Sequence, residues 1–269
     1  MNNVRNESIE IRNRIFKGLA LIYLLHFKEF KKKAAKYIDE LYLEDDNATE
    51  KQRLKHAEEP KNKITDLFVL YVILANTKAI NLINMNLQKI YNLNQNDIIN
   101  NIFKATKINM KSKKINIEDI INKYTKRSYD QKTSSNFNEK FVVDEIERML
   151  KNGDGTKKIS ARIQRIFFFN KTSADTITLT ETTRIQANAR LNTMFESEKY
   201  EGLMMVKIWR HQLYVNYPRD WHLDMDGEER PLHERFSNNL LYPGEPGAPA
   251  DEVINCHCFL DERIFKRGT

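Results

Sequence analysis

Glycine and proline are distributed very unevenly along this chain. Before residue 153 there is one glycine, Gly18, and one proline, Pro60, whereas the other seven glycines and five prolines all come later. Because glycine and proline mark turns and interrupt helices, the N-terminal part is predicted to form long helices with few breaks. The C-terminal part is predicted to be a compact, loop-rich lobe. The turn-forming sequence NGDG at 152–155 marks the boundary between them.

Apolar residues in the N-terminal half recur at helical spacing. A stripe from Ile9 to Phe30 predicts a first helix. A second helix is expected to begin just after Pro60, because the residue before a proline avoids the helical region. Apolar residues at 67–74 are too dense for one helix face, so that stretch is expected to be buried all round. Shorter helices are predicted over 97–105, 117–124, 138–150, 159–169 and 180–195.

β-Branched and aromatic residues gather in two C-terminal segments, at 204–216 and 253–260, and predict strands there. The predicted fold class is therefore α+β. A mainly helical domain with basic patches is expected over 1–152. A small α+β domain with an antiparallel sheet is expected over 153–269, with a helix starting at Thr180 packed against that sheet.

Positive charge is concentrated in the first half of the chain. Residues 1–150 carry 27 Lys and Arg against 20 Asp and Glu, whereas residues 220–262 carry eleven acids and only Arg230 and Arg235. A surface that touches polyanions is therefore expected outside the last lobe.

One basic segment, 104–132, stands out because it carries nine cations and three acids with two tyrosines between them. Clustered cations bind nucleic acid by releasing counterions, without reading its sequence. We expect this segment to bind double-stranded DNA; a solvated helix face in a lysine-rich protein is the alternative. A second cluster lies on the first helix, at Lys28, Lys31, Lys32, Lys33 and Lys36. The predicted DNA-binding residues are Lys104, Lys107, Lys111, Lys113, Lys114, Lys123, Lys126, Arg127 and Lys132.

Membrane contact and disulfides are not expected. The longest uninterrupted apolar run, Leu67–Ala75, has nine residues, whereas a spanning helix needs roughly 20. The two cysteines, Cys256 and Cys258, are separated by one residue. A disulfide between them would be strained, which indicates a reducing compartment.

An ordered set of short sequence elements occupies residues 180–258. It runs from TETTR at 180–184 through KIW at 207–209, RDWH at 219–222, DG at 226–227 and YPGEP at 242–246 to INCHC at 254–258. This set resembles the Mu F-like head morphogenesis domain of phage minor head proteins. The residues that carry the resemblance, with an implied structural role, are Thr180, Glu181, Arg184, Trp209, Arg219, His222, Gly227, Phe236, Pro243, Gly244, Glu252, Asn255, Cys256 and Cys258.

The resemblance implies a non-catalytic minor capsid protein of a tailed bacteriophage. Such a protein would take part in head morphogenesis and in the packaging, protection or delivery of viral DNA. Its implied partners are the phage portal and head proteins, and its implied location is the virion, inside the head near the portal. During assembly it would be found in the host cytoplasm.

The closing cysteines raise the question of a metal. Residue types that bind zinc are present at Cys256, Cys258 and His222, and a fourth could come from His211, His233 or His257. The family pattern usually has arginine at the position of His257. Structural zinc sites usually have two to four residues between paired cysteines. The sequence therefore favours two buried thiols with no metal and no cofactor, and a zinc site is the alternative.

A DNA-acting enzyme carried in the virion, a metal-dependent nuclease or toxin, is the competing class of function. His222, His233, Asp224, Asp226 and Glu252 are residue types that hydrolyse phosphodiesters with a metal. The acidic charge of 220–262 would repel a polyanionic substrate, so no enzymatic activity is expected.

Overall fold

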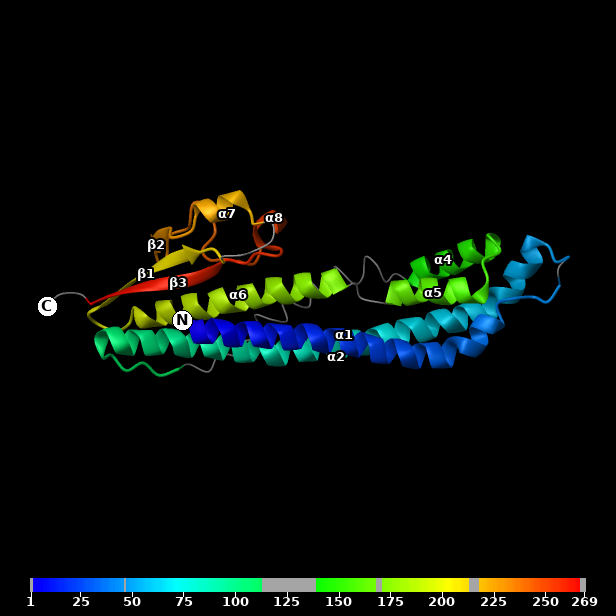
Figure 1. The fold of residues 1–269 in the computed structure, drawn as a ribbon, viewed down its shortest axis with the longest axis horizontal. Helices are drawn as coiled ribbons and strands as arrows, with labels where there is room; N and C mark the ends of the chain where they lie inside the picture. Colours follow the sequence, from blue (N-terminus) through cyan, green and yellow to red (C-terminus); the bar gives the residue numbers. More distant parts are fainter. Residues whose placement is uncertain (1, 46, 113–138, 168–170, 213–217, 267–269) are drawn as a thin grey trace. The chain divides into compact units, whose positions relative to one another are not determined.

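The computed structural model describes residues 2–45, 47–112, 139–167, 171–212 and 218–266 (Figure 1). The helices are α1 (Asn2–Asp39), α2 (Glu50–Thr106), α4 (Glu139–Lys151), α5 (Thr156–Phe167), α6 (Lys171–Ser197), α7 (Asp220–Asp224) and α8 (Ala250–Val253). The strands are β1 (Leu203–Arg210), β2 (Glu229–Pro231) and β3 (Phe259–Lys266). Long helices precede a small sheet, and the predicted α+β class is confirmed.

The three strands form one antiparallel sheet in the order β2-β1-β3. In the longer ladder Leu203 is opposite Lys266 and Arg210 is opposite Phe259. In the shorter ladder Ile208 is opposite Glu229. The central strand β1 therefore has a partner on both sides, and the predicted antiparallel sheet is confirmed.

The chain divides into two compact units whose parts alternate along the sequence. The sheet unit comprises 1–16, 83–125 and 175–269, and the helical unit comprises 17–82 and 126–174. Helices α1 and α2 each contribute to both units. The compact units thus do not follow the expected division at residues 152 and 153. Whether a fragment that starts near Thr156 folds alone stays a prediction.

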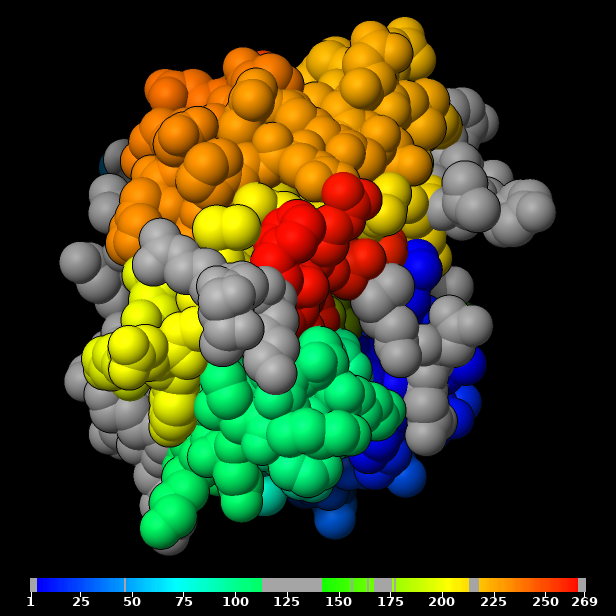
Figure 2. All heavy atoms as spheres, turned by 90° about the vertical axis from the view of Figure 1, so that its left-hand side faces the viewer, coloured from blue at the N-terminus to red at the C-terminus, as the bar shows by residue number. Residues whose placement is uncertain are grey.

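The core of the sheet unit lies between α6, the sheet and the end of α2. Leu191 of α6, Trp209 of β1 and Leu260 of β3 are buried there. Ile98 and Ile102 of α2 belong to the same apolar cluster. The loop-rich segment 218–249, gold and orange at the top of Figure 2, contributes Phe236, whose ring meets Trp209 edge-on at 5.3 Å.

In the helical unit, α1 and α2 present matched apolar faces at steps of three and four residues. Tyr23, Phe27 and Phe30 are buried on α1. Phe30 meets Phe68 of α2 edge-on, with ring centroids 5.9 Å apart. The Tyr23 hydroxyl donates a 2.7 Å hydrogen bond to Asn76. Of the stripe predicted from the sequence, Ile11, Ile15, Leu19 and Phe30 are buried, whereas Leu25 is exposed.

The start of α2 differs from the expectation at Pro60, which lies inside the helix. The helix begins at Glu50 because Thr49 and Gln52 form a reciprocal capping pair: the Thr49 amide donates to the Gln52 side chain at 2.8 Å, and the Gln52 amide donates to Thr49 Oγ1 at 3.4 Å. This cap satisfies N–H groups that a helix start otherwise leaves without partners.

The sequence predicted that the apolar stretch at 67–74 is buried all round, and this prediction is wrong. Leu70, Ile73 and Leu74 are 48%, 56% and 42% exposed. Helix α2 also contains an 18-residue window of mean hydropathy 1.5, of which 33% is buried, so by length and composition it is able to cross a membrane. Core helices of soluble proteins meet the same criterion, so this property alone assigns no membrane contact.

Other elements also begin or end at different residues than the sequence predicted. Helix α6 begins at Lys171, so Thr180 lies inside it and does not start it. The cysteines lie before β3 and not on a strand, because α8 and a turn occupy 250–255. Trp221 is 47% exposed and lies outside the buried core. The predicted helix at 117–124 falls outside the described residues.

Candidate functional site

Helix α6 anchors the loops of the sheet unit through a row of buried polar side chains. Arg184 forms an ion pair with Glu181 at 2.8 Å and donates from Nε to the carbonyl of Gly244 at 3.0 Å. Thr183 donates to the carbonyl of Cys256, and Thr180 accepts from the amide of Asn255. These contacts attach two distant loops to one helix face. The implied structural role of these motif residues agrees with this arrangement.

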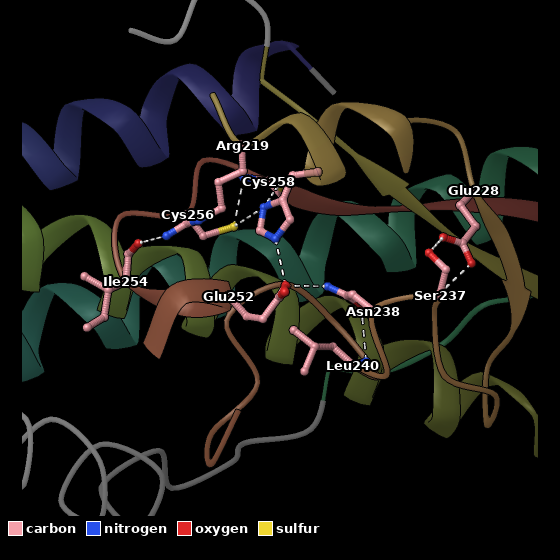
Figure 3. A network of polar contacts seen from close by, with 10 residues as sticks. Arg219, Glu228, Ser237, Asn238, Leu240, Glu252, Ile254, Cys256 and Cys258 are labelled. Carbon is pink, nitrogen blue, oxygen red and sulfur yellow. Dashed lines mark hydrogen bonds and ion pairs between the residues drawn. The ribbon is translucent and has the colours of Figure 1, made fainter. Parts of the chain in front are cut away.

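A second buried cluster joins the loop after α8 to helix α7. The Nδ1 atom of His222 lies 3.7 Å from Cys256 Sγ and 3.4 Å from Cys258 Sγ. The Nε2 atom of the same ring lies 2.9 Å from a carboxylate oxygen of Glu252. Glu252 also accepts a 2.9 Å hydrogen bond from the Asn238 amide (Figure 3). We call His222, Cys256 and Cys258 the Cys–His cluster.

The Cys–His cluster is electrostatically coupled. A hydrogen bond from Cys258 holds the pKa of the Cys256 thiol well below its usual value, and His222 lowers it further. The same hydrogen bond and burial raise the pKa of Cys258. Burial would lower the pKa of His222, but its contacts with Cys256 and Glu252 raise it overall. Negative charge is therefore favoured on Cys256, beside an imidazole.

The remaining motif residues shape the loops around this cluster. Arg219 donates to the carbonyl of Ile254 and so links the start of α7 to the loop after α8. Trp209 and Phe236 fill the core. Gly227, Gly244 and Asn255 have positive φ angles. Pro243 is buried in the turn beside Gly244.

The histidines outside the cluster have different surroundings. Burial and the nearby charge of Arg12 lower the pKa of His257 to about 4. His233 stacks on Phe195 and lies 2.9 Å from Glu198. His211 is buried just after β1. Of the residues considered for a nuclease, the structure pairs His222 with Glu252 in a buried setting, whereas His233 has a separate, exposed partner.

A buried ion-pair network joins α6, α2 and β3. Arg190 pairs with Asp97 of α2 at 2.7 Å and with Glu262 of β3. Glu262 also accepts a 2.9 Å hydrogen bond from Asn101. Asp97 was missed, because its place in the sequence gives no sign of this contact.

Three of the predicted DNA-binding cations lie in the described part of the chain. Lys104, Lys107 and Lys111 are exposed at and after the end of α2. The other predicted DNA-binding residues, Lys113, Lys114, Lys123, Lys126, Arg127 and Lys132, lie outside the described residues. The second cluster, which we call the α1 lysine cluster, is exposed at all five positions: Lys28, Lys31, Lys32, Lys33 and Lys36.

The helical unit also exposes large apolar side chains. Leu21, Leu24 and Leu25 of α1 are each at least 50% exposed. With Leu70, Ile73 and Leu74 of α2 they form the set that we call the exposed apolar residues of the helical unit. Exposed apolar groups of this kind commonly mark contact surfaces for other proteins.

The architecture of the sheet unit defines a class of protein: a long helix packed on a small antiparallel sheet, with loops held by buried polar groups and a Cys–His cluster. Residues 140–261 match the family model described as Phage Mu protein F like protein. The match confirms the resemblance predicted from the sequence and suggests a phage head morphogenesis protein.

A curated relative supports the same region of the chain. The uncharacterised protein YqbB of Bacillus subtilis (strain 168) is 28% identical over 125 residues. The alignment covers 44% of this chain and 40% of that relative, so it spans less than half of either protein. No solved structure matches the chain.

Proposed function

We propose that this chain is a non-catalytic minor head protein of a tailed bacteriophage. It lies inside the head near the portal and binds double-stranded DNA without reading its sequence. In that place it would assist packaging, protection or delivery of the viral DNA. The family match over 140–261 supports the head assignment, and the exposed cations support the contact with DNA.

The observation that carries the DNA proposal is the α1 lysine cluster. Its five ammonium groups lie within nine residues of one helix and all are exposed. Within the described part of the chain, none of the five forms a salt bridge. Cations that lack a carboxylate partner are free to replace the counterions of DNA phosphates. The basic segment 104–132 would add a second set of phosphate contacts.

DNA binding is tested by fluorescence anisotropy with two unrelated DNA duplexes at several salt concentrations. One variant replaces the five lysines of the α1 lysine cluster with glutamine, and a second does the same at Lys111, Lys113, Lys114, Lys126 and Arg127. Affinity should fall equally for both duplexes. The dependence of log Kd on log salt should become shallower by about 0.9 for each phosphate contact removed.

A matched control removes the same number of positive charges from cations that already have carboxylate partners. These are Lys61, Lys63, Arg148, Lys158 and Lys199, which pair with Glu147, Glu59, Glu145, Asp154 and Glu196. We expect the control to bind more tightly than either cluster variant. Unchanged affinity in both cluster variants, or an equal loss in the control, would contradict the proposal.

The competing function is a metal-dependent nuclease or toxin. The burial of His222, which is 1% exposed, argues against its direct contact with a DNA backbone. Incubation of supercoiled plasmid with the protein, with Mg²⁺, Mn²⁺ or Zn²⁺ and without metal, separates the two functions. Binding without cleavage supports the non-catalytic role, whereas cleavage that requires His222 or Glu252 supports the enzyme.

The exposed apolar residues of the helical unit offer a surface for a portal or head protein. Replacing Leu24 and Leu70 with lysine should leave the fold intact, because both side chains are about half exposed, yet reduce incorporation into assembled heads. Met204→Lys is the control, since Met204 is similarly exposed on β1. Normal incorporation of the Leu24 and Leu70 variant would exclude this surface.

A further inference from the structure

The Cys–His cluster has the geometry of a metal site. One nitrogen and two sulfur atoms lie within 4.8 Å of one another, and all three residues are buried. Zinc bonds of about 2.3 Å to sulfur and about 2.0–2.1 Å to nitrogen, in tetrahedral arrangement, separate such ligand atoms by about 3.5 Å. The observed separations from His222 Nδ1 are 3.4 and 3.7 Å. No large movement is needed for one ion to contact all three atoms.

Glu252 supplies the second feature of such a site. Its carboxylate lies 2.9 Å from His222 Nε2, so that nitrogen carries the proton and donates a hydrogen bond to the carboxylate. The lone pair is then on Nδ1, which faces both sulfur atoms. A carboxylate that fixes the tautomer of a metal-binding histidine in this way is the usual arrangement around zinc. Asn238 in turn holds Glu252 in place (Figure 3).

His211 is suited to be the fourth ligand. It follows Arg210, which is opposite Phe259 in the β1–β3 ladder, so continuing the register by one position places His211 opposite Cys258. Opposed residues of an antiparallel pair have their side chains on the same face. The His211 ring is buried, and among the described residues its Nδ1 atom has no hydrogen-bond partner.

His257 is less suited, although it lies between the two cysteines. In extended backbone, successive side chains point to opposite faces. Cys256 and Cys258 both approach His222, so extended backbone between them would direct the intervening side chain away from the cluster.

We propose that Cys256, Cys258, His222 and His211 bind one structural zinc ion, with Glu252 as the positioning residue for His222. This reverses the expectation of a metal-free pair of thiols. That expectation rested on the narrow spacing of the cysteines, and the structure shows that the spacing does not keep both sulfur atoms from His222. The buried ligand set leaves no position for substrate, so the ion would tie α7 and the end of β1 to the loop before β3.

The test is the metal content of the full-length protein, purified under reducing conditions from zinc-supplemented medium without chelator. We expect one zinc ion per chain by elemental analysis. Replacement with Co²⁺ should give the absorption bands of tetrahedral cobalt bound to thiolates. The proposal would be overturned by folded wild-type protein that lacks stoichiometric zinc and has either two free thiols or a Cys256–Cys258 disulfide. This holds whatever the variants do.

Variants assign the ligands, each compared with wild type by competition with a zinc-binding dye. Cys258→Ser and His222→Gln should lose stoichiometric zinc, and Glu252→Gln should weaken affinity by about 10–100-fold. His211→Gln should weaken affinity by at least a similar factor. His257→Gln is the matched control and should retain zinc. Retention by Cys258→Ser would refute the site, and loss in His257→Gln with retention in His211→Gln would refute the choice of fourth ligand.

Discussion

The contact between Gly244 and helix α6 allows a sharp test of how the loops are anchored. A Cβ atom at Gly244 would lie 3.1 Å from Cα and 3.2 Å from N of Arg184. Both are backbone atoms of a helix and cannot move aside individually. At Gly247, in the next turn of the same loop, a Cβ atom would meet nothing within 4 Å. The two φ angles are nearly equal, +80° and +87°, so the two alanine variants share the backbone strain and differ in the contact.

The free energies follow from these two differences. An alanine in the left-handed region costs about 1–2 kcal/mol, which applies to Gly247→Ala and Gly244→Ala alike. Overpacking against α6 adds about 1–3 kcal/mol for Gly244→Ala. Further loss follows if the 3.0 Å hydrogen bond from Arg184 is broken, since bonds to charged groups contribute about 1.5–3 kcal/mol. Gly244→Ala should therefore be the more destabilising variant, by at least about 1 kcal/mol.

Urea unfolding followed by circular dichroism measures both losses, and the slope of free energy against urea should stay constant if only stability changes. Equal destabilisation of Gly244→Ala and Gly247→Ala would refute the close contact with α6.

Three further predictions concern buried groups of the sheet unit. Burial lowers the pKa of Lys207 to about 8 from 10.5, so between these pH values the unfolded chain binds a proton that the folded chain has released. The stability of the wild type should therefore rise with pH across that window relative to Lys207→Met, by at most about 3 kcal/mol. A difference in urea midpoints that does not change with pH would contradict this. Arg190→Met removes the cation from a group of buried carboxylates and should cost about 3–5 kcal/mol at pH 7. Because burial raises the pKa of Glu262, protonation of Glu262 at acidic pH should make this loss smaller, and a loss independent of pH would exclude this cause. Trp209→Ala should lower stability by about 3–5 kcal/mol, whereas Trp221→Ala, at a half-exposed position, should change it by no more than about 0.5 kcal/mol; thermal unfolding compares the two.

Local patterns in the sequence predicted local structure well. The scarcity of glycine and proline predicted the long helices, and β-branched residues predicted β1. The start of α2 was also readable in principle, because Thr49 and Gln52 have the spacing of a reciprocal cap. Attention to Pro60 led to the wrong start, since a proline within a helix is compatible with it when packing compensates the lost hydrogen bond.

Contacts between distant parts of the chain could not be predicted from sequence patterns. Nothing around Asp97 indicates that it meets Arg190, and nothing in the first sixteen residues indicates that they join the sheet unit. The Cys–His cluster was an intermediate case. Its residue types were visible in the sequence, but only the structure shows that Glu252 fixes the orientation of His222.

The position of the protein in the phage particle tests the central claim most directly. A reconstruction of the assembled head without imposed symmetry, from phage whose copy of this chain carries a small added domain, should show extra density inside the head at the portal vertex. Particles of wild-type phage should contain the chain by mass spectrometry. Absence of the chain from purified heads, or density only on the outer surface away from the portal, would contradict the account.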